Sequence, residues 1–245
     1  MSGLDNVPHL RLGQVAGVPV TVDATYLLVV AYIALHVAQR TLDAAGYASV
    51  GAILLVGAFG SLLLHEAGHA VMASRLGYRT AGIWIGAGFG LALVEMPEGR
   101  NRDAVAILAA GPATNLLLAA AIFAVLNAPG LFEASAYPPP VEFTAAWPRG
   151  PAFFAIRSVG NLNLALAAVN LLPAFPLDGG RIYRIALRGW LADRNGVRII
   201  AGLGLASGLW CLLAAIAYSG GLALVGLLLL VVNWSILRGD EPPFE

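Results

Sequence analysis

The stretch VGAILLVGAFGSLLLHEAGHAVMASRL occupies residues 50–76 and contains no Asp, Glu, Lys or Arg before Glu66. An apolar run of about 20 residues is long enough to cross the hydrocarbon core of a bilayer as a helix. The whole chain has the same bias, since 59% of its 245 residues are hydrophobic and only 11% are charged. A soluble domain usually carries about 25% charged residues. The sequence therefore predicts a membrane protein.

Apolar segments recur along the chain and predict an all-α polytopic fold in one transmembrane domain, residues 1–245. The predicted spans are residues 24–42, 50–76, 104–126, 154–172, 200–218 and 221–237. The N-terminus has no basic region and no small-residue cleavage site after the first apolar block, so we expect no cleaved signal peptide. A single cysteine, Cys211, excludes an intrachain disulfide and a cysteine-based zinc site.

The segment Thr80–Met96 has a different pattern from the spans. Its larger apolar side chains fall on alternate positions with one interruption, and glycines lie among them: Ile83, Ile85, Phe89, Leu91 and Leu93. A period of two residues favours short β-strands. Because lipid cannot satisfy the amides of a strand, we expect a small membrane-embedded β segment near residues 80–96, buried in protein or lining a wet cavity.

The distribution of arginine predicts the orientation in the membrane. The chain has no lysine, and with six spans the loops on one side hold eleven arginines and those on the other side three. The positive-inside rule then places both termini and the opening of the site on the cytoplasmic side of a prokaryotic cell membrane. The net charge is zero, so no basic surface suggests a nucleic-acid partner.

The motif His65-Glu66-Ala67-Gly68-His69 lies within the predicted second span. Positions i and i+4 share one helix face, so both imidazoles can reach one metal ion, and Glu66 can accept a proton from a nearby water. Zinc is the metal we expect, because two imidazoles, a carboxylate and a water match its tetrahedral site. Ionisable side chains within a bilayer span are costly unless paired or hydrated, which favours a metal site over a chance match.

A third protein ligand has to come from elsewhere in the chain. Three carboxylates lie near membrane depth: Asp23, Asp103 and Asp178. Asp178 stands in NLLPAFPLDGGR at residues 170–181, where Pro173 and Pro176 should end the helix. The broken chain could turn Asp178 inward, or it could be an ordinary exit from helix to loop. The residues alone leave both possibilities open.

The two motifs together, HEAGH at 65–69 and NLLPAFPLDGGR at 170–181, resemble the site-2 protease family of intramembrane zinc metalloproteases. GPATN at 111–115 and GVPV at 17–20 look like further motifs of that family. The resemblance covers roughly residues 10–188. Many bacterial relatives carry PDZ or CBS domains, which we do not find, so the chain resembles a short form of the family.

This resemblance implies one Zn²⁺ per chain, with His65, His69 and Asp178 as ligands and Glu66 as general base and acid. It also implies that Asn170 helps to hold the substrate or its oxyanion. An interhelical hydrogen bond is the alternative role for Asn170.

The implied function is regulated intramembrane proteolysis, that is, hydrolysis of peptide bonds in transmembrane or membrane-anchored proteins within the lipid bilayer. A substrate helix must unwind before attack, and a strand could hold the unwound peptide by main-chain pairing. The candidate substrate-binding residues are Gly86, Gly88, Phe89 and Gly90. Two alternatives are a membrane metal carrier, which would move zinc without proteolysis, and a catalytically dead scaffold for transmembrane partners.

Overall fold

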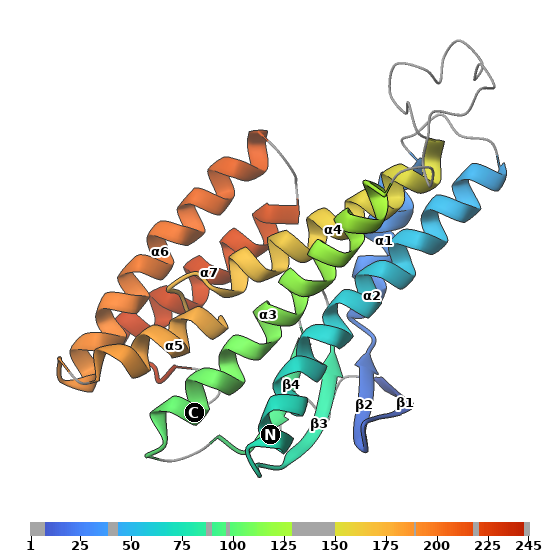
Figure 1. The fold of residues 1–245 in the computed structure, drawn as a ribbon. Helices are drawn as coiled ribbons and strands as arrows, with labels where there is room; N and C mark the ends of the chain where they lie inside the picture. The colour runs from blue at the N-terminus through green and yellow to red at the C-terminus, as the bar shows by residue number, and fades with distance from the viewer. Residues whose placement is uncertain are drawn as a thin grey trace. The chain divides into compact units, whose positions relative to one another are not determined.

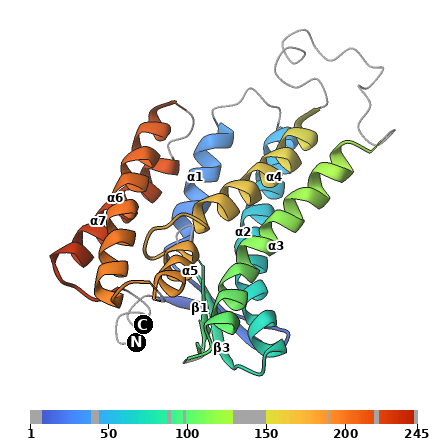
Figure 2. The ribbon, with the colours of Figure 1, turned by 60° about the vertical axis from the view of Figure 1, so that its left-hand side comes forward.

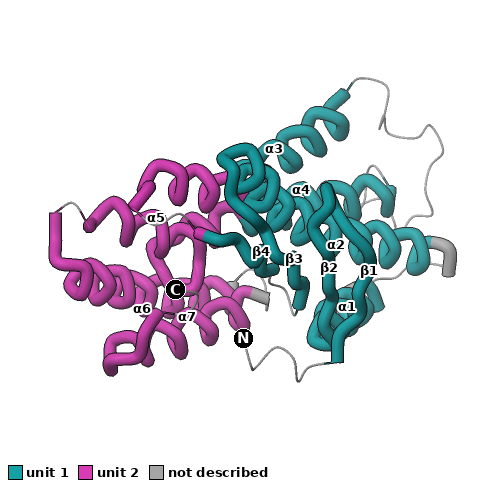
Figure 3. The backbone as a smooth tube through the Cα atoms, turned by 90° about the horizontal axis from the view of Figure 1, so that it is seen from below, with its two compact units in different colours: residues 1–95, 113–166 teal, residues 96–112, 167–245 magenta. Residues whose placement is uncertain are grey.

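The computed structural model describes residues 8–38, 44–86, 90–96, 99–128, 150–188, 190–217 and 221–242. Four strands and seven helices follow one another in this part of the chain (Figure 1), namely β1 (His9–Val15), β2 (Val18–Asp23), α1 (Tyr26–Ala38), α2 (Ala44–Arg75), β3 (Thr80–Ile85), β4 (Gly90–Val94), α3 (Asn101–Leu126), α4 (Gly150–Asn170), α5 (Asp178–Leu187), α6 (Asp193–Ala217) and α7 (Gly221–Arg238). The chain divides into two compact units, shown in Figure 3. The first consists of residues 1–95 and 113–166, and the second of residues 96–112 and 167–245.

Four helices are long and apolar enough to cross a membrane: Gly46–Arg75, Asn101–Leu126, Gly150–Asn170 and Asp193–Ile216. They overlap the second to fifth predicted spans, and the chain is accordingly an integral membrane protein that is mostly helical. Two shorter apolar helices, Tyr26–Leu35 and Leu222–Arg238, lie where the first and sixth spans are predicted. Six membrane crossings remain a prediction.

The first unit contains one four-stranded sheet, in the order β1-β2-β3-β4. Strands β1 and β2 form a hairpin whose turn residues, Ala16 and Gly17, both have positive φ, as a tight two-residue turn requires. Strand β2 pairs in parallel with β3, and β3 pairs antiparallel with β4. Strand β4 is therefore an edge of this sheet.

The sheet is larger than the sequence predicts. Strands β3 and β4 lie within residues 80–96, where a β segment is predicted, and the hairpin at residues 9–23 adds two strands that are not predicted. The sequence does contain a pattern that indicates this hairpin. Val18, Val20 and Val22 alternate with other residues after the Ala16-Gly17 turn, and this combination is typical of a hairpin.

The sheet packs against α2 (Figures 1 and 2). Ile83 and Ile85 of β3 are fully buried and cluster with Val20 of β2 and with Leu62 and Ala70 of α2. Close packing of these apolar side chains stabilises the contact through many small van der Waals attractions. The sheet thus lies beside the part of α2 that carries the HEAGH motif.

In the second unit, α6 and α7 run side by side (Figure 1). Glycines allow the two backbones to approach, because a Cβ added at Gly226 would lie 2.8 Å from the carbonyl oxygen of Gly208. Helix α5 is tied to the start of α6 by ion pairs from Arg184 and Arg188 to Asp193, with N–O distances of 2.5 Å and 3.0 Å.

Candidate metal centre

His65 and His69 of α2 form a buried pair of imidazoles, with 5% and 6% of their surfaces exposed. Their ring centroids lie 4.9 Å apart with an interplanar angle of 80°, and their potential ligand nitrogens lie within 4.8 Å of each other. Helical spacing explains the arrangement, since residues four apart lie on one face. Two nitrogen donors at this separation can hold one ion between them.

Asn115 of α3 orients the first histidine. The Nδ1–H of His65 donates a hydrogen bond to Asn115 Oδ1. The amide of Asn115 is itself oriented, because its Nδ2 donates to Ser61 O at 3.3 Å and to Asn163 Oδ1 at 2.7 Å. Because an amide oxygen can only accept a hydrogen bond, Nδ1 of His65 carries a proton, and Nε2 is the ring nitrogen that can serve as a metal ligand. Such a partner behind a metal-binding histidine sets the tautomer and the orientation of the ring.

The partners of Asn115 are also satisfied. Asn163 Nδ2 donates to Ser61 Oγ and to Val159 O, both at 2.8 Å, and Ser61 Oγ donates to Gly57 O at 2.6 Å. Ser61, Asn115 and Asn163 have no exposed surface. A buried polar network is stabilising only when its members find partners, and this one links α2, α3 and α4 behind His65. Asn115 is the last residue of the GPATN motif at 111–115, and no local pattern in the sequence predicts this role for it.

Glu66 is buried beside strand β4. The backbone N–H of Ala92 donates to Glu66 Oε2 at 2.6 Å. Gly90 lies so close to this side chain that an added Cβ would come within 2.7 Å of Glu66 Cδ. The edge strand thus holds the carboxylate of the HEAGH motif in place.

Asn170 and Asp178 belong to the second unit and flank the non-helical segment 171–177. Asn170 ends α4, Asp178 begins α5, and both side chains are half-buried. Burial lowers the pKa of Arg181. The negative charge of Asp178 acts in the opposite direction and raises that pKa, but by less. Pro173 and Pro176 break the helix at the predicted place.

The remaining predicted residues have simpler placements. Gly86 follows β3 and is buried, and Gly90 begins β4. Gly88 and Phe89 lie outside the described residues, so their substrate-binding role stays a prediction. Asp23, whose role the sequence leaves open, is buried and accepts hydrogen bonds from the backbone N–H (2.7 Å) and the hydroxyl of Thr25. It therefore caps the turn that leads into α1.

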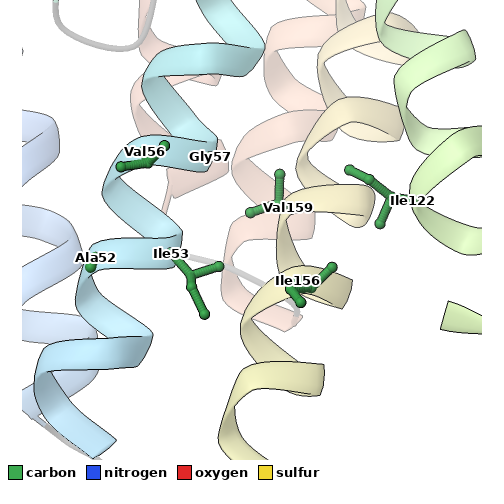
Figure 4. Close-up of a pocket in the computed structure, with 7 residues that line it drawn as sticks. All are labelled: Ala52, Ile53, Val56, Gly57, Ile122, Ile156 and Val159. Atoms are coloured by element: carbon green, nitrogen blue, oxygen red, sulfur yellow. The ribbon is translucent and has the colours of Figure 1, made fainter. Parts of the chain in front are cut away.

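The first unit also contains an apolar pocket of about 400 Å³ between α2, α3 and α4 (Figure 4). Its seven lining residues are aliphatic or glycine, with Val159 opposite Gly57 and with Ile122 and Ile156 beside them. None of them carries a titratable group or a metal ligand. The pocket is therefore separate in chemistry from the histidine pair.

The family model of peptidase family M50 matches residues 141–211. A putative zinc metalloprotease of Synechocystis sp. is 29% identical over 240 residues, 94% of this chain and 57% of that protein. A zinc metalloprotease of Methanocaldococcus jannaschii is 26% identical over 235 residues, 95% of this chain and 59% of that protein. A putative zinc metalloprotease of Mycobacterium tuberculosis is 30% identical over 203 residues, 80% of this chain and 47% of that protein.

This chain thus spans about half to three fifths of the length of these curated relatives. Among solved structures, the site-2 protease from Methanocaldococcus jannaschii has a TM-score of 0.62 and 24% identity, over 97% of this chain and 99% of that chain. The similarity of fold is therefore nearly complete in length. The matches confirm the predicted resemblance, and zinc is the metal in the names of all three relatives.

Proposed function

We propose, from the premise that this chain is a relative of the site-2 proteases of peptidase family M50, that it is an intramembrane zinc metalloprotease. Its substrates would be transmembrane or membrane-anchored proteins, and residues 1–245 would form a single protease domain. One observation carries the proposal. Glu66 stands between two buried imidazoles on one helix, and the first of them already has its Nδ1 proton committed to Asn115.

The proposed metal ligands are His65, His69 and Asp178, each of which offers one ligand atom. The donor set fits zinc, since two imidazoles and a carboxylate leave one position of a tetrahedral site open. When bound, zinc supplies Lewis-acid chemistry, which acidifies water and polarises a carbonyl. Asn115 supports this assignment because it accepts the hydrogen bond from Nδ1 of His65, which directs metal binding to Nε2.

Glu66 is the proposed general base and acid. It takes the proton from the attacking water and returns it to the leaving amine, which is the task of a carboxylate beside the reacting bond. Its bond to the Ala92 amide supports this role by limiting the rotamers of the side chain. Asn170 is proposed to donate a hydrogen bond to the oxyanion, where such a donor lowers the barrier by about 3–4 kcal/mol.

The edge strand β4 is the proposed substrate-binding element, with Gly86, Gly88, Phe89 and Gly90. An unwound peptide that adds to this edge would satisfy its own amides by main-chain pairing. The position of Glu66 against Ala92 supports this idea, since a strand added there would lie next to the general base. The arginine distribution supports six spans, with both termini and the site opening in the cytoplasm of a prokaryotic cell.

The decisive experiment compares purified variants for zinc content and for cleavage of a transmembrane reporter in proteoliposomes. We expect Glu66→Gln to bind one zinc per chain and to lose activity by about 10²–10⁴-fold. Asp178→Ala should bind zinc much more weakly, through the two imidazoles alone, and should lose activity, whereas Asp103→Ala, the same change at another carboxylate near membrane depth, should keep wild-type zinc affinity and activity. Full cleavage by Glu66→Gln would refute the assigned base. Zinc flux into the vesicles without cleavage would instead support a carrier.

A further inference from the structure

The segment 171–177, which precedes Asp178, has little regular structure to hold it. Two short turns give some of its hydrogen bonds, from Ala174 N to Leu172 O at 2.8 Å and from Leu177 N to Ala174 O at 3.0 Å. Phe175, between them, is 1% exposed. A buried backbone N–H or C=O needs a partner, because water cannot reach it. The backbone N–H and C=O of Phe175 therefore need hydrogen-bond partners within the protein.

A side chain from the last helix supplies both partners. The N–H of Phe175 donates to Asn233 Oδ1 at 3.1 Å, and Asn233 Nδ2 donates to Phe175 O at 2.7 Å. This pair of hydrogen bonds has the same pattern as the two that a hydrogen-bonded residue pair exchanges in an antiparallel sheet. The second hydrogen of Nδ2 goes to Leu229 O at 2.7 Å, so both donor hydrogens and the oxygen of the amide are used.

The surroundings are built around this contact. Asn233 has no exposed surface. Helix α6 makes room for it with Gly204, where an added Cβ would lie 2.6 Å from Asn233 Nδ2. The ring of Phe175 packs against Ile200 of α6 and Ile236 of α7. The α6–α7 pair thus holds Phe175 in two ways: Asn233 bonds to its backbone, and Ile200 and Ile236 pack against its side chain.

The contact is transmitted to Asp178 over a short and stiff path. Asp178 follows Phe175 by three residues and begins α5. Two residues further, Gly180 lies against the middle of the segment, since a Cβ there would come within 2.7 Å of the carbonyl carbon of Ala174. The segment and the first turn of α5 are therefore packed backbone on backbone, so that a shift at Phe175 would be passed on to Asp178.

We propose that Asn233 is a positioning residue for the metal ligand Asp178, so that α7 forms part of the metal site without contributing a ligand. The proposal rests on the proposed function, in which Asp178 binds zinc. A positioning role differs from a general role in stability. It predicts that loss of Asn233 weakens zinc binding only while Asp178 is present.

The test measures zinc affinity by competition with a chelator, and thermal stability, for each variant of the full chain in detergent. Asn233→Ala should weaken zinc binding by about 10–100-fold, as is usual when the support of a ligand is lost. Asn233→Asp, which keeps the volume and the acceptor but loses both donor bonds, should do the same and serves if Asn233→Ala does not fold. The control is Gly226→Ala, which strains the same hairpin at Gly208. It should lower stability and leave zinc affinity unchanged.

A double-mutant cycle separates the two roles. In the Asp178→Ala background, Asn233→Ala should change zinc affinity by less than about twofold, because the two residues act as one unit. Wild-type zinc affinity in Asn233→Ala or Asn233→Asp would overturn the proposal, and so would an equal loss with and without Asp178. If Asp178→Ala itself binds zinc normally, the proposed ligand set fails, and this outcome is recognised before Asn233 is tested.

Discussion

Helix α2 and the segment 171–177, which leads into Asp178, position the proposed metal ligands and are held in different ways. In α2 the backbone is satisfied within the helix, and the remote partner of His65 orients only one ring. In the segment the remote partner, Asn233, bonds to the backbone itself. The two partners are similarly distant in sequence, at 50 and 58 residues. The difference shows that a helix needs help only with side-chain orientation, whereas an irregular segment needs help with its path.

Among the contacts that support these two regions, the largest effect is expected from removing the hydrogen-bond acceptor of the His65 ring. Asn115→Ala leaves the Nδ1–H of His65 without its acceptor and breaks the link to Asn163, so the imidazole loses its fixed orientation and tautomer. We expect zinc affinity to fall by about 10–100-fold, measured by chelator competition.

The matched control for Asn115 is Asn127→Ala, the same change just after the end of α3, where the exposed side chain donates a hydrogen bond within its own turn to Phe123 O. It should leave zinc affinity unchanged. Equal zinc affinity in Asn115→Ala and the wild type would show that the helix alone orients His65, and the contrast between the two regions would then be sharper.

An intermediate effect is expected at the strand that holds Glu66. The methyl group of Gly90→Ala would overlap the Glu66 side chain and push the carboxylate from the Ala92 amide. We expect cleavage to slow by about 10-fold, a fraction of what a general base contributes, with zinc content unchanged.

Gly82→Ala is the comparison for Gly90→Ala. It places a methyl group in β3 with 3.6 Å to its nearest neighbour, Pro19 O, and it should cleave at the wild-type rate. If Gly90→Ala lost zinc instead of activity, β4 would support the histidine pair and not the base.

The smallest effect is expected from the ion pairs that join α5 to α6. Asp193→Asn removes the charge that Arg184 and Arg188 share, but 45% of the aspartate side chain is exposed. The free energy of unfolding should fall by at most about 1 kcal/mol, measured by denaturant titration in detergent, and the loss should shrink at high salt. Zinc affinity should not change. A loss of zinc would mean that α5, and not only the segment before it, positions Asp178. Asp240→Asn, at an exposed carboxylate after α7, is the control.

Much of the fold could be predicted because hydrophobic length and helical period are local properties. The four long helices overlap spans that the apolar runs predict, and the spacing of His65 and His69 predicts that they share one face. The hairpin at residues 9–23 is not predicted, although the sequence contains a turn at Ala16-Gly17 and alternating valines after it. Strand β2 lies before the first apolar run, and its partner β3 follows about 60 residues later, so no local pattern indicates that the two strands pair.

Asn115 and Asn233 show a different limit. Each is a polar residue in an apolar helix, which indicates a buried partner, but no local pattern names that partner. Hydrogen bonds between residues 50 or more positions apart depend on how helices pack. The sequence could therefore mark such residues as important without assigning them a task.

The amino-acid sequence by itself determined that the chain is apolar enough for a membrane, that two imidazoles and a carboxylate share a helix, and that prolines interrupt the chain before Asp178. These features depend on composition and on the spacing of near neighbours. Only the tertiary structure decided which nitrogen of His65 keeps its proton, what holds Glu66, and which side chain supports the backbone at Phe175. Those answers come from groups that are far apart along the chain, and packing alone brings them within hydrogen-bonding distance.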